Sequence, residues 1–441
     1  MKTIFITTFH SFISRNIIGT PIIDLFLGEG FRVVILVFPK KEQFFIEKYG
    51  RDGVAIETVP RELIYRDAIL RYLALFAMNT RSLKIKRKTE MRGSGVWLSL
   101  VISHWSLRSL SYKVIRLLSY WLTPKNKFSS LFEKYKPNIV FSTDIQNEND
   151  VRMLVEAKSW GIKTVGMVRA WDNLATKGLI RFVPDKLIVH NEIMKGEALA
   201  LQGIPAEWVK VVGIPHYDHY LSGKHSSREE FFRKIGGDAK RKLVLFAPTG
   251  DRYLANNTID KDIVDILDKT LPENFQILVR LPPTDKVNGI EEENTSERVL
   301  VVRPSKRFKG SRTAEISCED DEHLIDTLFH SDLVVSGPST MCVDAALFDK
   351  PIILTAFDGM GERSYYESIR RYFDYNHWDA IKKSGGAYLA ENKEAFVAKV
   401  KEYIGNPALD KECRRKLIEE QTWKLDGKAC ERVVEVIKLL I

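Results

Sequence analysis

The segment DLVVSGPSTMCVDAALFDKPIIL, residues 332–354, decides the fold because it joins a strand, a tight turn, a helix and a second strand. Residues 332–336 form a short apolar run, which is typical of a strand buried in a parallel sheet. Apolar residues at helical spacing follow over 341–348, and a second apolar run begins at Pro351. The turn between them contains only small or hydroxyl-bearing residues and a proline: Ser336, Gly337, Pro338, Ser339 and Thr340. This order predicts βα units in a parallel sheet.

The same turn has the chemistry of a phosphate-binding loop. A glycine lets a ligand approach the backbone closely, and the free amides at a helix start favour an anion. The hydroxyls of Ser336, Ser339 and Thr340 add donors, and Asp344, about one turn into the helix, can accept from a ribose hydroxyl. A plain strand–turn–helix with Ser339 as N-cap explains the same residues. The turn alone therefore leaves both interpretations open.

Similar units recur along the rest of the chain, where β-branched runs alternate with amphipathic stretches. In the first half the predicted strands are 2–8, 32–38, 54–58, 138–143, 163–168 and 185–190, with a crossover helix over 147–159. In the second half they are 242–248, 275–280, 298–302, 332–336 and 351–355, with helices near 259–270, 321–330 and 341–348. The tail from about 392 is predicted to be helical.

Two domains follow from this pattern. Residues 213–226 interrupt it with a proline, two glycines and three histidines, which marks a boundary. At 441 residues the chain is long enough for two α/β cores. We predict an N-terminal Rossmann-like domain over 1–220, a C-terminal one over 221–415, and a terminal helix over 416–441.

Cysteine usage and apolar runs exclude several classes of protein. The four cysteines are scattered, which argues against a zinc site or a disulfide framework and favours a reducing cytoplasm. The acidic run 318–323 suits a helix start better than a metal site, so we expect neither a metal nor a cofactor. The apolar run at the N-terminus is too short for a signal peptide, and no run is long enough to span a bilayer.

Residues 81–127 carry the excess positive charge, with eleven Lys and Arg against the single acid Glu90. Within the stretch 96–122, apolar residues fall on one helical arc and basic residues lie across from it. The arc contains Leu107, Leu110, Val114, Leu117, Leu118 and Trp121, and the basic residues are Arg108, Lys113 and Arg116. Such a helix can lie in a membrane interface, aided by nearby aromatic rings. The alternative is a surface helix that packs its arc on the sheet and leaves its basic face solvated.

Four segments together resemble the GT-B group of glycosyltransferases. The segment 332–354 is similar to the donor-binding unit of lipid-A-disaccharide synthases and CDP-glycerol glycerophosphotransferases, with Asp344, Lys350 and Pro351 in matching places. VLFAPTGDR (244–252) resembles the glycerophosphotransferases, which implies that Thr249 and Arg252 meet a diphosphate. VVGIPHYD (211–218) resembles an interdomain turn that these enzymes share with UDP-N-acetylglucosamine 2-epimerases, formed here by Gly213, Pro215, His216 and Asp218. DGKACERVVEVI (426–437) resembles their C-terminal helix, which tends to clasp the first domain.

The resemblance implies the GT-B architecture, two Rossmann-like parallel-sheet domains facing across a cleft, with a C-terminal helical tail. Two departures stand out. Many relatives carry a His-Pro pair after the second strand of the C-terminal domain, whereas this chain has Arg280, which can supply positive charge instead. The first βα turn, TTFHSFISRN, lacks the glycine-rich loop common in nucleotide-sugar transferases.

Candidate catalytic and acceptor residues follow the strands of the first half, at the edge where α/β sites form. His10 is the first candidate base and Asp144 the second, whereas a hydrogen-bonded loop histidine and a turn or capping aspartate are the alternatives. The candidate acceptor-binding residues are Arg15, Arg169, Trp171, Asp172 and Lys177.

The sequence thus predicts a metal-independent transferase that moves a sugar from a nucleotide diphosphate or CMP-linked donor to a surface-glycan or lipid-linked acceptor. Its nearest rival transfers glycerol phosphate or another polyol phosphate from a CDP-linked donor. A 2-epimerase and a non-catalytic membrane or nucleic-acid module are further alternatives. No nucleic-acid motif accompanies the charge, so we expect an anionic membrane as partner and no nucleic acid. The expected location is cytoplasmic, peripheral on the inner face of the membrane.

Overall fold

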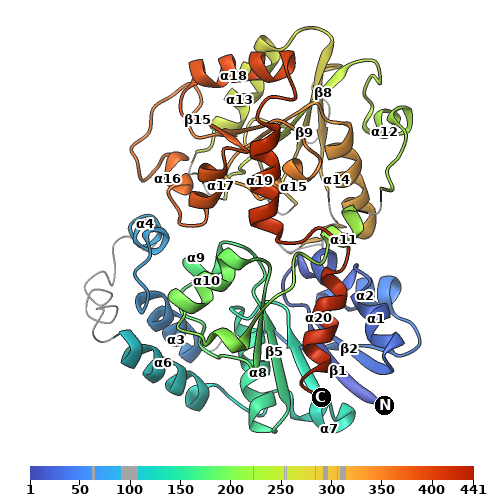
Figure 1. Ribbon diagram of the computed structural model, residues 1–441, viewed down its shortest axis with the longest axis vertical. Helices are drawn as coiled ribbons and strands as arrows, with labels where there is room; N and C mark the ends of the chain where they lie inside the picture. The colour runs from blue at the N-terminus through green and yellow to red at the C-terminus, as the bar shows by residue number, and fades with distance from the viewer. Residues whose placement is uncertain are drawn as a thin grey trace. The chain divides into compact units, whose positions relative to one another are not determined.

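The computed structural model divides into two compact units (Figure 1). Unit 1 comprises Met1–Ser222 and Thr422–Ile441, and unit 2 comprises Gly223–Gln421. The structure describes residues 1–61, 65–90, 108–221, 223–252, 254, 256–283, 285–291, 296–304, 306–307 and 314–441.

Unit 1 is built on a parallel sheet in which seven strands of the described chain are ordered β3-β2-β1-β4-β5-β6-β7. The strands are β1 (Lys2–Thr7), β2 (Phe31–Val37), β3 (Val54–Thr58), β4 (Ile139–Ser142), β5 (Lys163–Met167), β6 (Lys186–Val189) and β7 (Val209–Val211). The predicted strands of the first half are confirmed to within a residue or two. The three-residue strand β7 was not predicted, because it is too short to show a periodicity.

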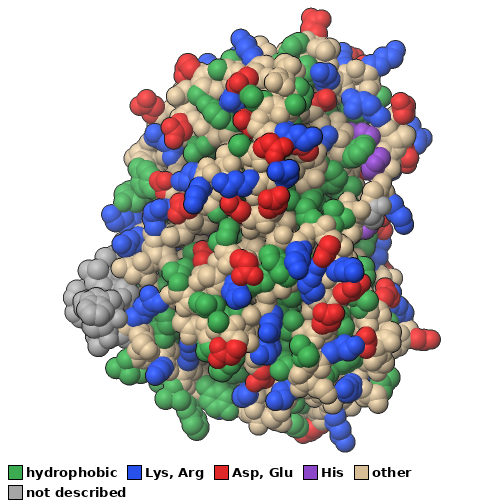
Figure 2. All heavy atoms as spheres, in the orientation of Figure 1, with side chains coloured by type: hydrophobic (Ala, Val, Ile, Leu, Met, Phe, Trp, Pro, Cys, Tyr) green, Lys and Arg blue, Asp and Glu red, His purple; other side chains and the backbone are tan. Residues whose placement is uncertain are grey.

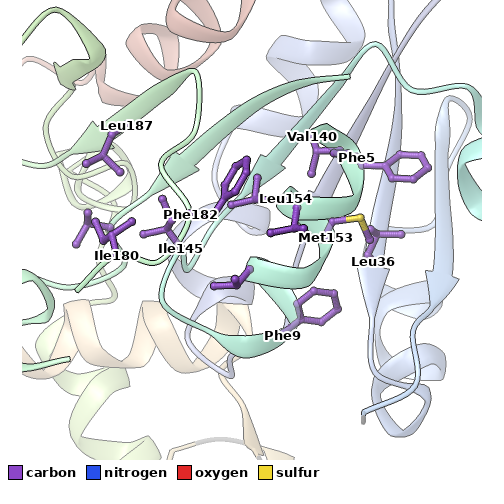
Figure 3. Close-up of a cluster of buried hydrophobic side chains, with 14 of the residues drawn as sticks. Phe5, Phe9, Leu36, Val140, Ile145, Met153, Leu154, Ile180, Phe182 and Leu187 are labelled. Carbon is purple, nitrogen blue, oxygen red and sulfur yellow. The ribbon is translucent and has the colours of Figure 1, made fainter. Parts of the chain in front are cut away.

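The helices of unit 1 are α1 (Ile22–Gly28), α2 (Glu42–Tyr49), α3 (Tyr65–Phe76), α4 (Arg81–Thr89), α6 (Arg108–Leu122), α7 (Ser129–Tyr135), α8 (Glu148–Ser159), α9 (Asn173–Thr176), α10 (Glu192–Ala200), α11 (Tyr217–Tyr220) and α20 (Ala429–Lys438), with short turns η1 (Ser14–Ile18), η2 (Pro39–Lys41) and η3 (Ala206–Trp208). Helices α1, α2, α8 and α10 pack on this sheet, and others pack on helices, as α20 does on α1 and α6 on α3. Figure 3 shows side chains from β1, β2, β4 and α8 meeting in one buried cluster, among them Phe5, Leu36, Val140, Met153 and Leu154. The predicted crossover helix is α8.

Unit 2 is built on a second parallel sheet, of six strands in the described chain, ordered β10-β9-β8-β13-β14-β15. The strands are β8 (Lys242–Ala247), β9 (Phe275–Arg280), β10 (Val299–Val302), β13 (Leu333–Ser336), β14 (Ile352–Thr355) and β15 (Tyr388–Ala390), beside a small antiparallel pair, β11 (Lys306–Arg307) and β12 (Ala314–Glu315). The helices are α12 (Arg228–Ile235), α13 (Ile259–Thr270), α14 (Cys318–His330), α15 (Met341–Leu347), α16 (Arg370–Phe373), α17 (Trp378–Ser384), α18 (Lys393–Gly405) and α19 (Lys411–Thr422). The predicted strands and helices of this half are confirmed, and the fold class is the expected one.

The acidic run 318–323 begins a helix, as predicted. Ser317 caps α14, because its hydroxyl accepts from the Asp320 backbone and the Asp320 carboxylate accepts in return from the Ser317 backbone. This reciprocal pair satisfies two amides that a helix start leaves free. The carboxylates of the run therefore stabilise the helix start and its dipole.

The last helix belongs to unit 1. Helix α20 packs against α1 and α11, and its apolar face, which includes Val433 and Ile437, is fully buried. The Asp218 carboxylate accepts from the backbone amides of Ala429 and Cys430, at 3.1 and 2.8 Å. Asp218, in the turn that the sequence analysis singled out, therefore holds the start of this helix.

Helix α6 turns its apolar arc outward. Leu110, Leu117 and Trp121 are 60%, 57% and 67% exposed, whereas Tyr112 and Ile115 are buried. Figure 2 shows hydrophobic side chains gathered over α6 at the lower left. The interpretation in which this arc packs on the sheet is wrong for the part of the helix that the structure describes; residues 96–107 of the predicted stretch lie outside it.

The basic face of α6 is only partly solvated: Lys113 is exposed, whereas Arg108 and Arg116 are hydrogen-bonded to unit 1 carbonyl groups. Arg116 donates to the carbonyl oxygens of Ile180 and Gln202, at 3.1 and 2.6 Å, and Arg108 donates to that of Ala200. These guanidinium groups hold the helix against unit 1 and leave its apolar arc unpaired. Across the described ranges, no helix combines the length and the hydropathy that crossing a bilayer requires.

Candidate functional site

The carboxyl edge of the unit 1 sheet gathers charged side chains from separate strands. His10 lies shortly after β1, Asp144 follows β4, and Arg169 follows β5. Lys177 directly follows the short helix α9, and its ammonium also reaches Asp144. Because the ends of parallel strands meet at one edge, residues far apart in the sequence form a single cluster there.

Asp144 is the centre of this cluster and is only 2% exposed. Its carboxylate accepts from Arg169 Nε at 2.9 Å and from Lys177 Nζ at 3.4 Å. Burial acts to raise the pKa of Asp144, but Lys177 and Arg169 outweigh it and hold that pKa well below its usual range. The carboxylate is therefore ionised and paired, and it is not the cap of α8, because Asn147 occupies that position.

His10 lies beside the same charges. Burial, followed by Arg169, lowers the pKa of His10 to about 3, so the ring is neutral at ordinary pH. The backbone amide of Phe12 donates to Nδ1 at 3.2 Å, which places the proton of the neutral ring on Nε2. In this arrangement His10 presents a donor from Nε2, and a role as base requires the other tautomer.

A second buried carboxyl, Asp150, lies behind Asp144 at the start of α8. Thr7 and Ser142 both donate to its Oδ1. Burial and the nearby charge of Asp144 raise the pKa of Asp150 to about 8, so it is protonated at neutral pH. From the sequence, Asp150 was predicted only as part of a crossover helix, because helical spacing carries no information on which carboxyl is desolvated.

A pocket opens at the same edge. Its polar lining is Asn16, Thr143, Arg169, His190 and His216. His190 follows β6 and was not predicted, whereas His216 was assigned only to the interdomain turn. In that turn Gly213 adopts a φ of 91°, which favours glycine, and its amide donates to the His190 carbonyl at 3.0 Å.

The remaining predicted acceptor residues lie around this cluster with partners of their own. Arg15 Nε donates to Asn16 Oδ1 at 2.9 Å. Trp171 packs against the hydrophobic core of unit 1. The Asp172 carboxylate accepts from the Thr176 hydroxyl at 3.0 Å. Of the five predicted acceptor residues, Arg169 and Lys177 pair with Asp144, Arg15 bonds to Asn16 of the pocket lining, and Trp171 lies beside the core.

In unit 2, the predicted phosphate-binding turn surrounds two buried hydroxyls. Ser336 Oγ and Thr249 Oγ1 are both shielded from solvent and make no hydrogen bond in the described chain. Gly337 lies between β13 and α15, and a Cβ there would collide with the Thr249 hydroxyl. The backbone of the 336–340 turn therefore approaches Thr249 as closely as a glycine permits.

Asp260, at the start of α13, holds the loop that contains Thr249, which the 336–340 turn approaches. Its carboxylate accepts from the backbone amides of Thr249 and Gly250, each at 2.9 Å, and it is 2% exposed. Asp285 accepts from the Arg252 amide at 2.7 Å, while the Arg252 side chain is exposed. Asp260 was not predicted, since its role depends on a loop ten residues away.

Comparison with known proteins assigns the chain to a family. The model of the family "CDP-Glycerol:Poly(glycerophosphate) glycerophosphotransferase" matches residues 170–439, more than half of the chain. The chain belongs to this family. None of the curated proteins matches it.

Solved structures that resemble this glycerophosphotransferase-family chain share its fold. A putative UDP-N-acetylglucosamine 2-epimerase from Listeria monocytogenes has a TM-score of 0.57 and 12% identity, covering 99% of this chain and 96% of its own. A glycosyltransferase from Rickettsia africae has a TM-score of 0.53 and 12% identity, with 100% and 98% covered. An H444N variant of the wall teichoic acid polymerase TagF has a TM-score of 0.54 and 11% identity, with 99% and 88% covered. The chain is thus a GT-B transferase of the glycerophosphotransferase family.

The other donor residues of this family member lie on and beside α15. Thr340 is the N-cap position of α15 and makes no side-chain capping bond, whereas Ser339 Oγ accepts from the Met341 amide at 3.3 Å. Asp344 is in the first turn and is 5% exposed. Lys350, in its predicted place before the next strand, donates to the Phe329 carbonyl at 2.7 Å.

Arg280, which stands where relatives carry a His-Pro pair, is engaged elsewhere. Its guanidinium contacts His323 Nδ1 at 2.7 Å and the Asp320 carbonyl at 3.1 Å. Burial, followed by Arg280, lowers the pKa of His323 to about 4, so the ring accepts from the arginine. Within the described residues, no group of three or more His, Cys, Asp or Glu side chains is disposed to hold a metal ion.

Proposed function

We propose that the protein transfers the activated group of a nucleotide-linked donor, a sugar or a polyol phosphate, to a hydroxyl of a surface-glycan or lipid-linked acceptor. Unit 2 would bind the donor and the carboxyl edge of unit 1 the acceptor. The observation that supports this most directly is the pair of buried hydroxyls at Ser336 and Thr249 beside Gly337. Buried hydroxyls without partners cost free energy that phosphate oxygens would recover.

In the proposed step, an acceptor oxygen forms a bond to the transferred carbon or phosphorus atom, and the bond from that atom to the departing nucleotide phosphate oxygen breaks. The acceptor proton passes to a base, and the leaving phosphate gains negative charge. Backbone amides at the start of α15 and the hydroxyls around Gly337 would stabilise this charge. His10 remains the first candidate base and Asp144 the second.

Two donor classes fit this site. The glycosyl version is supported by the GT-B fold that the chain shares with a solved glycosyltransferase. The glycerol-phosphate version is supported by the family to which the chain belongs, and the sequence resemblance implies the same place for Asp344. The nucleotide base distinguishes CDP-glycerol from UDP-linked sugars.

The test is to incubate purified protein separately with CDP-glycerol and with a panel of UDP-, GDP-, TDP- and CMP-linked sugars. We expect one donor to be bound, seen as a thermal shift, and slowly hydrolysed by water. The reaction should persist in EDTA, because a helix start and positive side chains replace a metal in this proposal. Absence of binding and of hydrolysis for every donor would refute the function.

We also propose that the protein binds the inner face of the cytoplasmic membrane, and two neighbouring helices of unit 1 that turn apolar faces outward support this. Helices α3 and α6 contact each other. On α3 the exposed residues at helical spacing are Tyr65, Ile69 and Tyr72, and on α6 they are Leu110, Val114, Leu117, Leu118, Trp121 and Leu122. Exposed apolar surface on neighbouring elements is typical of an interaction site.

The charges beside these faces favour an anionic bilayer over a protein partner. Arg71 and Lys113 are exposed on the same two helices, and the Lys125 ammonium lies over the rings of Tyr120 and Trp121, at 4.2 and 5.0 Å from their centroids. Aromatic and aliphatic side chains insert at the headgroup boundary while cations meet lipid phosphates. A lipid-linked acceptor would be reached from this position.

Vesicle sedimentation tests the membrane assignment. The double variant Leu117→Ser and Trp121→Ser should weaken binding to phosphatidylglycerol vesicles by about tenfold or more, since two exposed apolar side chains lose their burial in lipid. Trp208→Ala, at another exposed tryptophan of unit 1, is the matched control and should bind as the wild type does. Binding to nucleic acid but not to vesicles would contradict the assignment.

A further inference from the structure

His190 and His216 are two buried imidazoles that line one pocket and have unused hydrogen-bonding capacity. Each is 8% exposed. Neither ring is hydrogen-bonded to another residue in the part of the chain that the structure describes, although His216 contacts the rings of Tyr217 and Tyr220, with centroids 4.6 and 5.6 Å away. A buried polar group without a partner costs about 1–3 kcal/mol, so such groups usually face water or a ligand.

The protonation of the two rings limits what they can bind. Burial lowers the pKa of His190 to about 4, and burial, followed by Arg15, lowers that of His216. Both rings are therefore neutral at ordinary pH, and each offers one N–H donor and one bare nitrogen that accepts. A phosphate oxygen can use only the donors, whereas a hydroxyl both donates and accepts. The pair consequently complements hydroxyl groups better than it complements an anion.

The rest of the pocket agrees with a hydroxyl-bearing ligand. Ile13, Ile17, Met167 and Pro215 supply the apolar part of the pocket lining beside the two imidazoles. Asn16 and Thr143 add neutral polar groups, and Arg169 is the charged residue of the lining. Arg169 also pairs with Asp144, so the pocket adjoins the charged cluster where His10 lies.

We infer that His190 and His216 bind vicinal hydroxyls of the acceptor, a sugar or polyol unit, and thereby position its reacting oxygen. This inference rests on the proposed function and assigns the acceptor class at the same edge of unit 1. The two histidines act as positioning residues, because they hold hydroxyl groups while the base lies elsewhere in the cluster.

Imidazole nitrogen NMR of the full chain tests this directly. Protein labelled with ¹⁵N-histidine is titrated with glycerol 3-phosphate, with N-acetylglucosamine and with inorganic phosphate, and the two signals are assigned from the variants His190→Phe and His216→Phe. We expect saturable shifts of both rings with at least one hydroxyl-bearing probe and none with phosphate. Equal shifts with phosphate, or no saturable shift with either hydroxyl-bearing probe, would overturn the inference.

Kinetics supply the second readout once a donor is identified. In His190→Phe and His216→Phe, the KM for the acceptor probe should rise about tenfold, whereas hydrolysis of the donor by water and its KM should stay within about twofold. His190→Gln, which keeps a donor and an acceptor, should recover part of the loss. His219→Phe is the matched control, because His219 lies on α11, the helix that directly follows His216, but does not line the pocket.

The two proposals fail in different ways. Lack of any nucleotide binding by unit 2 would refute the proposed function without moving the imidazole signals. Intact donor binding and hydrolysis, combined with an acceptor KM that neither histidine variant changes, would refute this inference alone. If a phenylalanine variant does not fold, the wild-type titration and His190→Gln decide the outcome.

Discussion

The two candidate sites of the molecule differ in the groups that form them. The edge of unit 1 concentrates buried charge, with Asp144 held between Arg169 and Lys177 and a protonated Asp150 behind it. The turn in unit 2 is made of backbone and neutral hydroxyls, packed so closely that Gly337 has no room for a side chain. Charge pairing therefore organises the unit 1 site, and close packing of the backbone organises the unit 2 site.

This difference suits two ligands of different character. A nucleotide phosphate brings its own charge and needs amides and hydroxyls in fixed positions. A neutral acceptor hydroxyl needs its proton removed, which requires a base near the reacting oxygen whose pKa the neighbouring charges adjust. The comparison predicts that unit 2 is sensitive to added volume, whereas unit 1 is sensitive to changed charge.

The largest expected effect is that of added volume at Gly337. Gly337→Ala places a Cβ against the Thr249 hydroxyl, so the turn or Thr249 has to move. We expect donor binding to be lost and turnover to fall by about a hundredfold or more, because displacement of a positioned group by about 1 Å has that effect. Thermal shift with CDP and UDP measures the binding.

Gly361→Ala is the matched control, because nothing lies within 4 Å of a Cβ at that position. It should leave binding and turnover near wild-type values. If Gly337→Ala binds nucleotide as tightly as Gly361→Ala does, the turn is not shaped for the donor. The claim that the unit 2 site depends on close packing would then be wrong.

Charge removal at Asp144 is expected to come second. Asp144→Asn leaves Arg169 and Lys177 together without their shared carboxylate, and breaking a buried pair costs about 3–5 kcal/mol. Since Lys177 is partly exposed, we expect a loss near the lower end, about 3 kcal/mol, in the free energy of unfolding measured by urea titration. Glu230→Gln, which breaks the exposed pair with Lys234, should cost under about 1 kcal/mol. Equal losses in the two variants would show that the unit 1 cluster is not electrostatically special.

The two sites also differ in how far the sequence predicted them. The unit 2 turn was predicted in detail because strand, turn, helix and next strand are contiguous over 332–354. The unit 1 edge was predicted only as separate residues at strand ends. Which of them share a cluster depends on strand order, and β1 lies beside β4 although more than a hundred residues separate them.

Orientation and desolvation account for most of what was missed. Helical spacing located the apolar arc of α6 but not the side that faces water, which is set by hydrogen bonds from Arg116 to distant carbonyls. Similarly, Asp260 and His190 resemble ordinary polar residues until their burial and neighbours are known. Local patterns therefore predicted the elements, whereas the burial and the partners of the residues on them depend on tertiary contacts.

The smallest effect, and the one of opposite sign, is expected at Asp150. Its pKa is raised in the folded state to about 8, so the unfolded state holds fewer protons at that site between roughly pH 4 and 8. Stability should therefore fall as pH rises through this window, and the loss should be complete above pH 8. Asp150→Asn keeps an oxygen that can accept from Thr7 and Ser142 but cannot ionise.

We expect this variant to be more stable than the wild type at pH 8 by at least about 1 kcal/mol, which corresponds to roughly 2–4 °C in Tm. The gain should shrink as pH falls toward 5, because the stabilisation that the unfolded state gains by ionising this carboxyl becomes smaller at each lower pH within the window. Thermal unfolding of both proteins from pH 5 to pH 9 measures it. A stability difference that does not vary with pH would mean that Asp150 does not carry the proton that its burial beside Asp144 requires, and the acidic half of the unit 1 cluster would need a different charge assignment.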